Sequence, residues 1–166
     1  MSIYHIAQVN IGRVRAPVED PIMAGFVNRL VELNALADRS PGLVWRLQTA
    51  GGDATYYRPY DDDRILVNMS VWESIEALKK YVYKTVHAEL LRQRHEWFEQ
   101  FSSTYLALWW VPAGHIPGMD EAKKRIAHLD LHGPTQYAFT FKATFEPDEE
   151  YQRQIDWRSF QPCPAM

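Results

Sequence analysis

Hydrophobic and polar residues alternate in four separate stretches of the chain, and this alternation predicts four β-strands. The stretches are 3–12, 43–48, 64–72 and 103–111. Side chains of a strand point alternately to its two faces, so each stretch would present two faces of different character. Turn-forming residues separate the strands, most densely between the second and the third.

Other segments repeat their apolar residues every three or four positions, which is the period of an amphipathic helix. One follows the first strand and ends at 40–42, where Ser, Pro and Gly stop a helix. A second begins after Ser74, a candidate N-cap, and is predicted to continue as one long helix to Phe101. An additional amphipathic helix is expected over 119–132 and a short additional strand over 137–145.

The predicted elements follow the order β-α-β-β-α-β. This order is the ferredoxin-like pattern of an α+β domain with a four-stranded antiparallel sheet. We expect residues 1–145 to form this domain together with its added helix, and residues 146–166 to form a C-terminal tail. Two helices cover only one face of such a sheet, and the other face would still be largely apolar. Burial of that face against a second copy of the chain predicts a homodimer.

One face of the predicted sheet gathers polar side chains. It combines the following residues, without any Lys or Glu: Gln8, Asn10, Arg46, Gln48, Asn68, Ser70 and Trp72. In small-molecule pockets apolar area provides affinity and a few polar groups provide orientation, so this face is a candidate ligand site. The alternative is that this face is simply the solvated one.

The predicted helix up to Phe101 places two basic side chains inside its apolar arc. At about 100° per residue, His87 and Arg94 fall within that arc, whereas His95 lies at its edge. A buried arginine needs a hydrogen bond or an anion, from the protein or from a ligand. Tyr83 and Trp97 are aromatic candidates for ligand contact. For His87 the alternative is an ordinary core histidine.

Composition and charge argue against several classes of function. The 166 residues are 13% aromatic, a share that suits a flat ligand or a subunit interface. A net charge of −3 without a basic block gives nucleic acid no electrostatic footprint. There is no signal-peptide pattern and no apolar stretch near 18 residues, so no membrane association is expected. The single cysteine, Cys163, permits no internal disulfide and indicates a cytoplasmic location.

Motifs of other chemistries are incomplete. The glycines at 51–52 lack the Lys-Ser/Thr of a phosphate-binding loop, and His95-Glu96 lacks the second histidine of a helical zinc site. His128 and His132 are four residues apart, a spacing that can bind a metal but that near a helix end is more often a solvated pair. No metal site is therefore predicted.

Several strings of the sequence resemble a known superfamily. They are "AQVNIGR", "PGLVWRLQ", "LVNMSVWESIEALKKYV", "VHAELLRQRHEWF" and "YLALWWVPAGH". With the order of the elements, "LVNMSVWESIEALKKYV" is similar to the dimeric α/β-barrel superfamily, which includes antibiotic-biosynthesis and heme-degrading monooxygenases. The other four strings carry a closer likeness, from about Ile3 to about Phe141, to a bacterial domain-of-unknown-function family within it. This resemblance implies a barrel formed by two copies of the chain.

The heme-degrading members of that superfamily use an asparagine on the first strand, a tryptophan on the second helix and a histidine as axial iron ligand. Asn10 in "AQVNIGR" matches the asparagine by its place in the strand, and His87 in "VYKTVH" matches the histidine by its local string. The tryptophan has no equivalent, because the matching segment offers only Ala77 or Tyr81. The resemblance makes heme a candidate cofactor.

These features lead to three functional hypotheses. The first is a monooxygenase-like oxidoreductase that acts on a small aromatic or heme-like ligand. With heme, His87 would ligate the iron and Asn10 would orient bound oxygen. Without a cofactor, His87 would be the base, and Asn10, Asn68 and Arg46 or Arg94 would stabilise the anion. The second is a non-catalytic small-molecule-binding protein, and the third is an isomerase or cyclase with His87 as base.

Overall fold

The computed structural model of the chain describes residues 3–48, 59–85, 87–101 and 103–163. Its strands are β1 (Tyr4–Arg13), β2 (Leu43–Arg46), β3 (Ile65–Trp72) and β4 (Leu106–Pro112). Its α-helices are α1 (Ala24–Arg39), α2 (Ile75–Tyr83), α3 (His87–Gln93), α4 (Met119–His132) and α5 (Glu149–Arg153). Short 3-10 helices are η1 (Pro21–Met23), η2 (Arg94–Glu96) and η3 (Trp157–Ser159).

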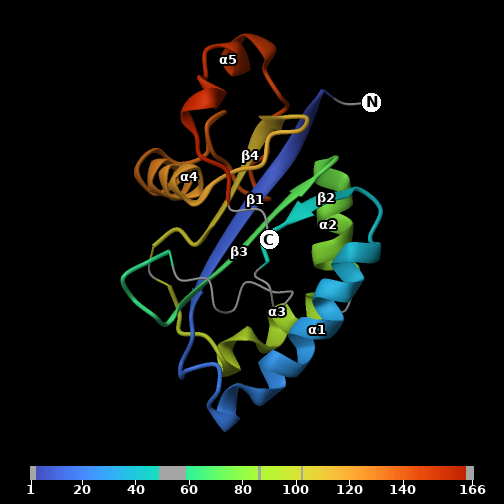
Figure 1. Cartoon of the computed structure of the whole chain (residues 1–166), viewed down its shortest axis with the longest axis vertical. Helices are drawn as coiled ribbons and strands as arrows, with labels where there is room; N and C mark the ends of the chain where they lie inside the picture. The colour runs from blue at the N-terminus through green and yellow to red at the C-terminus, as the bar shows by residue number, and fades with distance from the viewer. Residues whose placement is uncertain (1–2, 49–58, 86, 102, 164–166) are drawn as a thin grey trace.

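One antiparallel sheet holds the four strands in the order β2-β3-β1-β4 (Figure 1). The central strand β1 pairs with β3 on one side and with β4 on the other. Its register places Gln8 opposite Ser70 and Asn10 opposite Asn68. Strand order and sequence order together define a ferredoxin-like fold, so the predicted α+β class is confirmed.

Local signals in the sequence set the ends of the first two long helices. The side chain of Asp20 accepts a hydrogen bond from the backbone N–H of Ile22 and thereby starts the turn that leads into α1. Gly42, at φ +91°, makes the left-handed turn from α1 into β2, a conformation that favours glycine. The predicted N-cap of α2 is confirmed, because the Ser74 hydroxyl accepts a hydrogen bond from Ala77 N–H at 3.1 Å.

The prediction of one continuous helix up to Phe101 is wrong. The segment is divided into α2, α3 and η2, and α2 ends after Tyr83. Thr85 supplies the physical reason, because its hydroxyl donates to the Tyr81 carbonyl and accepts a hydrogen bond from His87 N–H. Such a side chain competes with the helical hydrogen-bond ladder, and here it begins a new helix at His87.

The strand predicted over 137–145 is also wrong. The chain makes only two isolated bridges there, Leu108–Phe139 and Thr140–Ala143. Phe139 is fully buried, and both of its backbone groups bond to Leu108, at 2.8 and 2.9 Å. The alternating pattern therefore reflects burial of Phe139 at the edge of β4 without a paired strand. The helix predicted over 119–132 is confirmed as α4.

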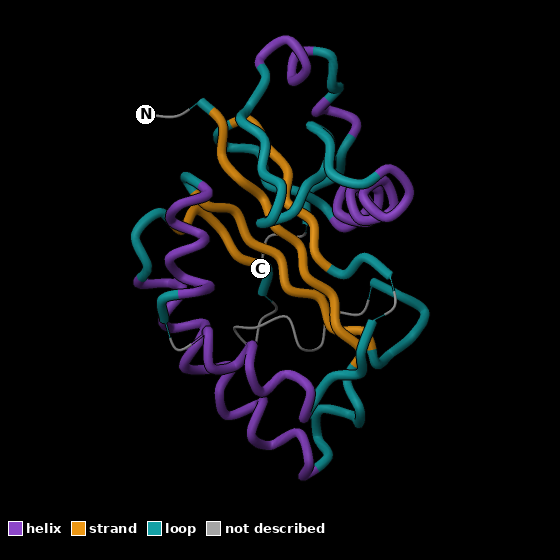
Figure 2. The backbone as a smooth tube through the Cα atoms, turned by 180° about the vertical axis from the view of Figure 1, so that it is seen from behind, coloured by secondary structure: helices purple, strands orange, loops and turns teal. Residues whose placement is uncertain are grey.

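The helices lie in two groups on opposite sides of the sheet (Figures 1 and 2). α1, α2 and α3 lie on the side of the polar sheet face, while α4 and α5 lie on the other side. The second side carries the main core, where apolar residues of the sheet pack against one face of α4: Ala7, Val9, Met69, Trp109, Met119, Ala122, Ile126 and Leu129.

This second layer changes the argument for a homodimer. The sheet face expected to need a second copy is buried within one chain, with Val9, Val71 and Val111 at 0% exposure. The premise of an uncovered apolar face is therefore wrong, and homodimerisation stays a prediction. Within the described residues, no helix is long and apolar enough to cross a membrane.

Candidate functional site

A cavity of about 290 Å³ lies between the polar face of the sheet and the helices α1, α2 and α3. Its floor consists of β1 and β3 residues, among them Gln8, Asn10, Asn68 and Ser70. Within the polar stripe predicted from strand alternation, Gln8 and Ser70 are buried beneath the helices, whereas Asn68 is exposed. Such a mixed polar and apolar enclosure is typical of a small-molecule site.

The helices supply the walls of the cavity. Three of the predicted site residues are among the lining: Tyr83 at the end of α2, His87 at the start of α3 and Arg94 in η2. Aromatic side chains complete the lining, and three of them come from outside these helices: Phe98, Tyr105 and Phe141. The helical-wheel argument thus placed His87 and Arg94 on the inner side, although they belong to two separate short helices.

Part of the polar floor is satisfied by a chain of internal hydrogen bonds. The Gln8 amide donates to Asn68 Oδ1 at 2.7 Å and to Ser70 Oγ at 2.8 Å. Ser70 Oγ also accepts from Trp72 Nε1 at 2.8 Å. These residues are locked to one another, and their main role is to fix the shape of the floor.

Several other polar side chains of the lining have no side-chain hydrogen bond within the described part of the chain. Among them are Asn10 and Arg94, two of the residues predicted to carry chemistry. Nδ1 of His87 is fully buried and unpaired. Buried polar groups are normally paired, so unpaired groups around one cavity indicate partners that a ligand would supply.

Burial sets the charge state of His87. It lowers the pKa of His87 below its ordinary 6.5, and the backbone of Val82 opposes this shift in part. The imidazole is therefore neutral at neutral pH. Its ring lies 5.1 Å from the ring of Tyr81, so an aromatic wall holds it in place.

Tyr81 forms this aromatic wall without becoming a reactive group. Burial raises the pKa of Tyr81 to about 12, and its hydroxyl donates to the Leu33 carbonyl at 3.1 Å. Its ring stacks on Trp72 with centroids 5.2 Å apart. Trp72 therefore supports the cavity from behind Tyr81, and it does not line the cavity as predicted.

Two further predicted ligand contacts lie elsewhere. Arg46 forms an ion pair with Asp38, in which Nε lies 2.7 Å from Oδ1 and Nη2 lies 3.1 Å from Oδ2. This carboxylate at the end of α1 draws Arg46 away from the cavity. Trp97 is buried against Phe26, with ring centroids 5.9 Å apart, and is not among the residues that line the cavity.

Sequence reasoning missed the contribution of α1 and of the segment after α4. Asn34 lines the cavity from α1, where it interrupts the apolar stripe that contains Leu30 and Leu33. A polar residue beside such a stripe was a usable signal. Tyr105 and Phe141 had no signal, because their approach to the cavity depends on how the chain packs beyond the sheet.

A second cavity of about 450 Å³ adjoins the first. Four residues line both cavities and form the boundary between them: Tyr83, Tyr105, Leu106 and Phe141. The rings of Tyr83 and Phe141 meet edge to face across this boundary, with centroids 5.4 Å apart. These two rings therefore limit how far a ligand can extend from the His87 side.

The cavity beside His87 does not fit heme. Its volume of about 290 Å³ lies at the lower end of the range for small-molecule sites. This space suits a few fused rings. Heme is larger, because it comprises four pyrrole rings and two propionates. The Tyr81 ring packed against His87 further restricts approach to the imidazole.

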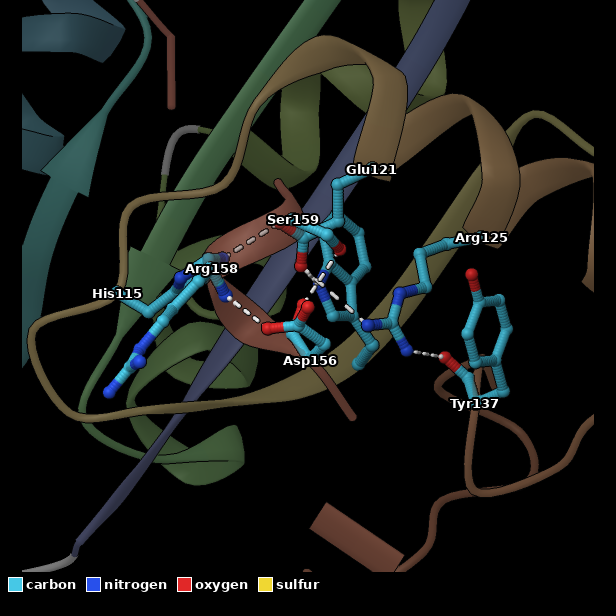
Figure 3. A network of polar contacts seen from close by, with 8 residues as sticks. His115, Glu121, Arg125, Tyr137, Asp156, Arg158 and Ser159 are labelled. Carbon is cyan, nitrogen blue, oxygen red and sulfur yellow. Dashed lines mark hydrogen bonds and ion pairs between the residues drawn. The ribbon is translucent and has the colours of Figure 1, made fainter. Parts of the chain in front are cut away.

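A second buried polar network lies on the opposite side of the sheet (Figure 3). The Glu121 carboxylate accepts a hydrogen bond from Trp109 Nε1 at 2.8 Å and contacts His115 Nε2 at 2.8 Å. Arg125 donates to the Tyr137 carbonyl at 2.7 Å, and its guanidinium lies 3.9 Å from the centroid of the Tyr137 ring. Glu121 and Arg125 are each 1% exposed, and the signal in the sequence was their i, i+4 spacing on the apolar side of α4.

The C-terminal segment docks over this network. The Trp157 ring lies 4.8 Å from the His115 ring, and Cys163 is buried in the main core. At the start of α4, a Cβ on Gly118 would lie 1.7 Å from the Gln161 carbonyl oxygen. Glycine is therefore required at this position so that the C-terminal backbone can approach.

Comparison with known proteins places this fold in a family. The model of a family described as "Domain of unknown function (DUF3291)" matches residues 5–155. No curated protein matches. A conserved protein from Methanosarcina mazei Go1 has a similar structure, with a TM-score of 0.48 and 13% identity over 66% of this chain and 93% of that chain. A point mutant of SnoaB, a cofactor-independent oxygenase from Streptomyces nogalater, has a TM-score of 0.44 and 18% identity over 66% and 93%.

Proposed function

The chain belongs to the DUF3291 family, and we propose that the protein is a cofactor-independent oxygenase. It binds a small, flat, weakly acidic molecule beside His87 and removes a proton from it for reaction with molecular oxygen. The observation that carries this proposal is the His87 imidazole at the cavity wall: burial keeps it neutral, and its Nδ1 has no hydrogen-bond partner among the described residues.

His87 has the properties of a general base. An imidazole accepts a proton only while it is neutral, and the lowered pKa keeps His87 neutral at neutral pH. His87 lines the cavity, so its imidazole can offer a nitrogen lone pair to a proton of the ligand. A base must lie within hydrogen-bond reach of the proton that it removes, and a ligand in this cavity lies against His87.

The two asparagines of the floor supply stabilisation for the resulting anion. Asn10 and Asn68 face each other in the β1–β3 register, and both line the cavity. Asn68 Oδ1 is held by Gln8, which leaves the Asn68 amide N–H groups for a ligand. Preorganised donors aimed at a developing oxyanion stabilise a transition state more than water does, because they need no reorganisation.

The reaction balances with oxygen as the sole co-reactant. His87 removes one proton from a CH₂ group activated by neighbouring rings, and the carbanion transfers its electrons to O₂ with formation of a C–O bond. The proton on His87 passes to the distal peroxide oxygen. Loss of the second C–H proton then forms the C=O bond and breaks the O–O bond, and the departing hydroxide combines with that proton as water. The sum is R₂CH₂ + O₂ → R₂C=O + H₂O, in which carbon is oxidised and oxygen is reduced.

The same geometry supports a second function that requires no oxygen. An isomerase or cyclase would use His87 to remove a proton and return it at another carbon, with the same asparagines holding the enolate. The neutral His87 imidazole supports this function equally, whereas a protein that only binds its ligand needs no base.

Anthrone is a suitable probe, because it is flat and carries one CH₂ between two aromatic rings. We expect wild-type protein to accelerate oxygen uptake and anthraquinone formation, and His87→Gln to slow both by about 10²- to 10⁴-fold, the usual contribution of a general base. His95→Gln is the matched control, since His95 is exposed and should leave the rate unchanged.

Each other outcome points to a different function. Solvent exchange of the CH₂ protons without oxygen uptake would indicate the isomerase-type reaction. Saturable binding without exchange or oxygen uptake would indicate a binding protein. An equal rate in His87→Gln would show that His87 is not the base.

A further inference from the structure

Among the described arginines that are at least partly buried, Arg94 differs from the others because it pairs with no carboxylate. Six of the described arginines form ion pairs with carboxylates: Arg13, Arg29, Arg46, Arg64, Arg125 and Arg153. Arg94 is partly buried, and within the described ranges its side chain has neither a hydrogen bond nor an ion pair. Its contacts are aromatic, with the guanidinium carbon 4.9 Å from the Tyr105 ring centroid and 5.6 Å from that of Phe98.

The acidic residues near Arg94 in the sequence are engaged elsewhere or exposed. Glu89 pairs with Arg29 at 3.2 Å, and Glu99 lies 3.1 Å from Arg64. Glu96 is exposed. The protein therefore holds the Arg94 guanidinium against two rings and does not neutralise it. Stacking on rings fixes the plane of the guanidinium and leaves its N–H donors at the edge available.

The charge of the cavity wall follows from this arrangement. Among the described residues of the lining there is no Asp, Glu or Lys, and His87 is neutral. Arg94 alone gives the lining a formal charge, which is positive. A guanidinium in a largely apolar enclosure attracts an anion strongly, because little water competes for it.

From this geometry we infer that the ligand of this cavity carries a permanent anionic group, a carboxylate or a sulfonate, which Arg94 binds while the flat body of the ligand lies on the polar floor. The inference rests on the proposed function only in placing the ligand beside His87. It adds a substrate class, namely aromatic acids, and it assigns Arg94 as the residue that selects them over neutral analogues.

Two fluorescent dyes with the same aromatic body provide the test. Anilinonaphthalene sulfonate carries a sulfonate, and N-phenyl-naphthylamine lacks it. We expect wild-type protein to bind one sulfonate dye per chain, with competition by anthrone, and to bind the neutral dye more weakly. Arg94→Gln should weaken binding of the sulfonate dye by roughly 10- to 100-fold, the range for a hydrogen bond to a charged group, without affecting the neutral dye.

Arg92→Gln is the matched control, since Arg92 lies two residues away and is exposed. It should leave binding of both dyes unchanged. Equal binding of the two dyes by wild-type protein would overturn the inference, as would an equal loss of both dyes in Arg94→Gln. Neither result would contradict the proposal that a ligand binds in this cavity with His87 as its base. If neither dye binds and anthrone does not react, the proposed function fails as well.

Discussion

At the scale of single residues, the unusual feature is a neutral histidine whose buried Nδ1 has no hydrogen-bond partner among the described residues. A folded-state pKa below the ordinary value means that between the two values the unfolded chain binds more protons than the folded chain. The contribution of His87 to stability is therefore complete above about pH 6.5 and is lost as the pH falls toward its lowered pKa.

This sign gives a direct prediction for His87. Stability of the wild-type protein, measured by urea unfolding, should fall between about pH 7.5 and pH 5.5 more steeply than that of His87→Gln. The difference between the two slopes isolates His87 from the other titrating groups. His95→Gln, at an exposed position, should retain the wild-type slope. A wild-type slope in His87→Gln would show that His87 titrates normally.

Residue types and local spacing predicted several residues that line the cavity. Strand alternation identified Gln8, Asn10, Asn68 and Ser70, and helical spacing identified His87 with Arg94. Arg46 was misplaced because its carboxylate partner, Asp38, lies on another element. Pairing between side chains distant in sequence is a property of packing, and strand alternation does not contain it.

At the scale of elements, the break between α2 and α3 determines the form of the cavity. Tyr83 ends α2 and meets Phe141, a residue that follows α4. The boundary between the two cavities is therefore built from distant parts of the chain. Periodicity predicted a continuous helix and therefore missed this boundary. The hydroxyl of Thr85 overrides a pattern that otherwise favours a helix.

We expect Tyr83→Ala to join the two cavities. Loss of the ring should admit an aromatic acid longer than the cavity beside His87, and pyrene butyrate is a suitable probe. In Tyr83→Ala, the affinity for pyrene butyrate should rise at least tenfold relative to the affinity for anilinonaphthalene sulfonate, as measured by fluorescence titration. Tyr83→Phe keeps the ring and should behave as the wild type. An unchanged ratio in Tyr83→Ala would show that other residues separate the cavities.

At the scale of the whole molecule, helices cover the sheet on both sides, with α1, α2 and α3 on one side and α4 and α5 on the other. The order of strands and helices and the extra helix α4 were predictable, because each has a strong local pattern. The place of α4 over the apolar sheet face was not, since amphipathicity states only that a helix needs a partner surface. A homodimer, which size-exclusion chromatography with light scattering would detect, would have to use another surface than this face.

The docking of the C-terminal segment can be tested through Cys163, the single cysteine of the chain. Gly118→Ala places a methyl group against the Gln161 backbone and should displace the segment. We expect a loss of about 1–3 kcal/mol in the free energy of unfolding, as for other overpacked sites. Reaction of Cys163 with a thiol reagent should become faster. Asp120→Ala, at an exposed position in the first turn of α4, should leave Cys163 protected.

The alternation of β1 has a consequence for the evolution of the family. Successive residues of this strand serve opposite layers: Gln8 and Asn10 face the cavity, while Ala7 and Val9 belong to the core beneath α4. Insertion or deletion of one residue within β1 would exchange the two sets, exposing apolar groups to the cavity and burying amides in the core. Homologues should therefore keep the length of this strand fixed, and any change of ligand would have to come from substitutions on its cavity side.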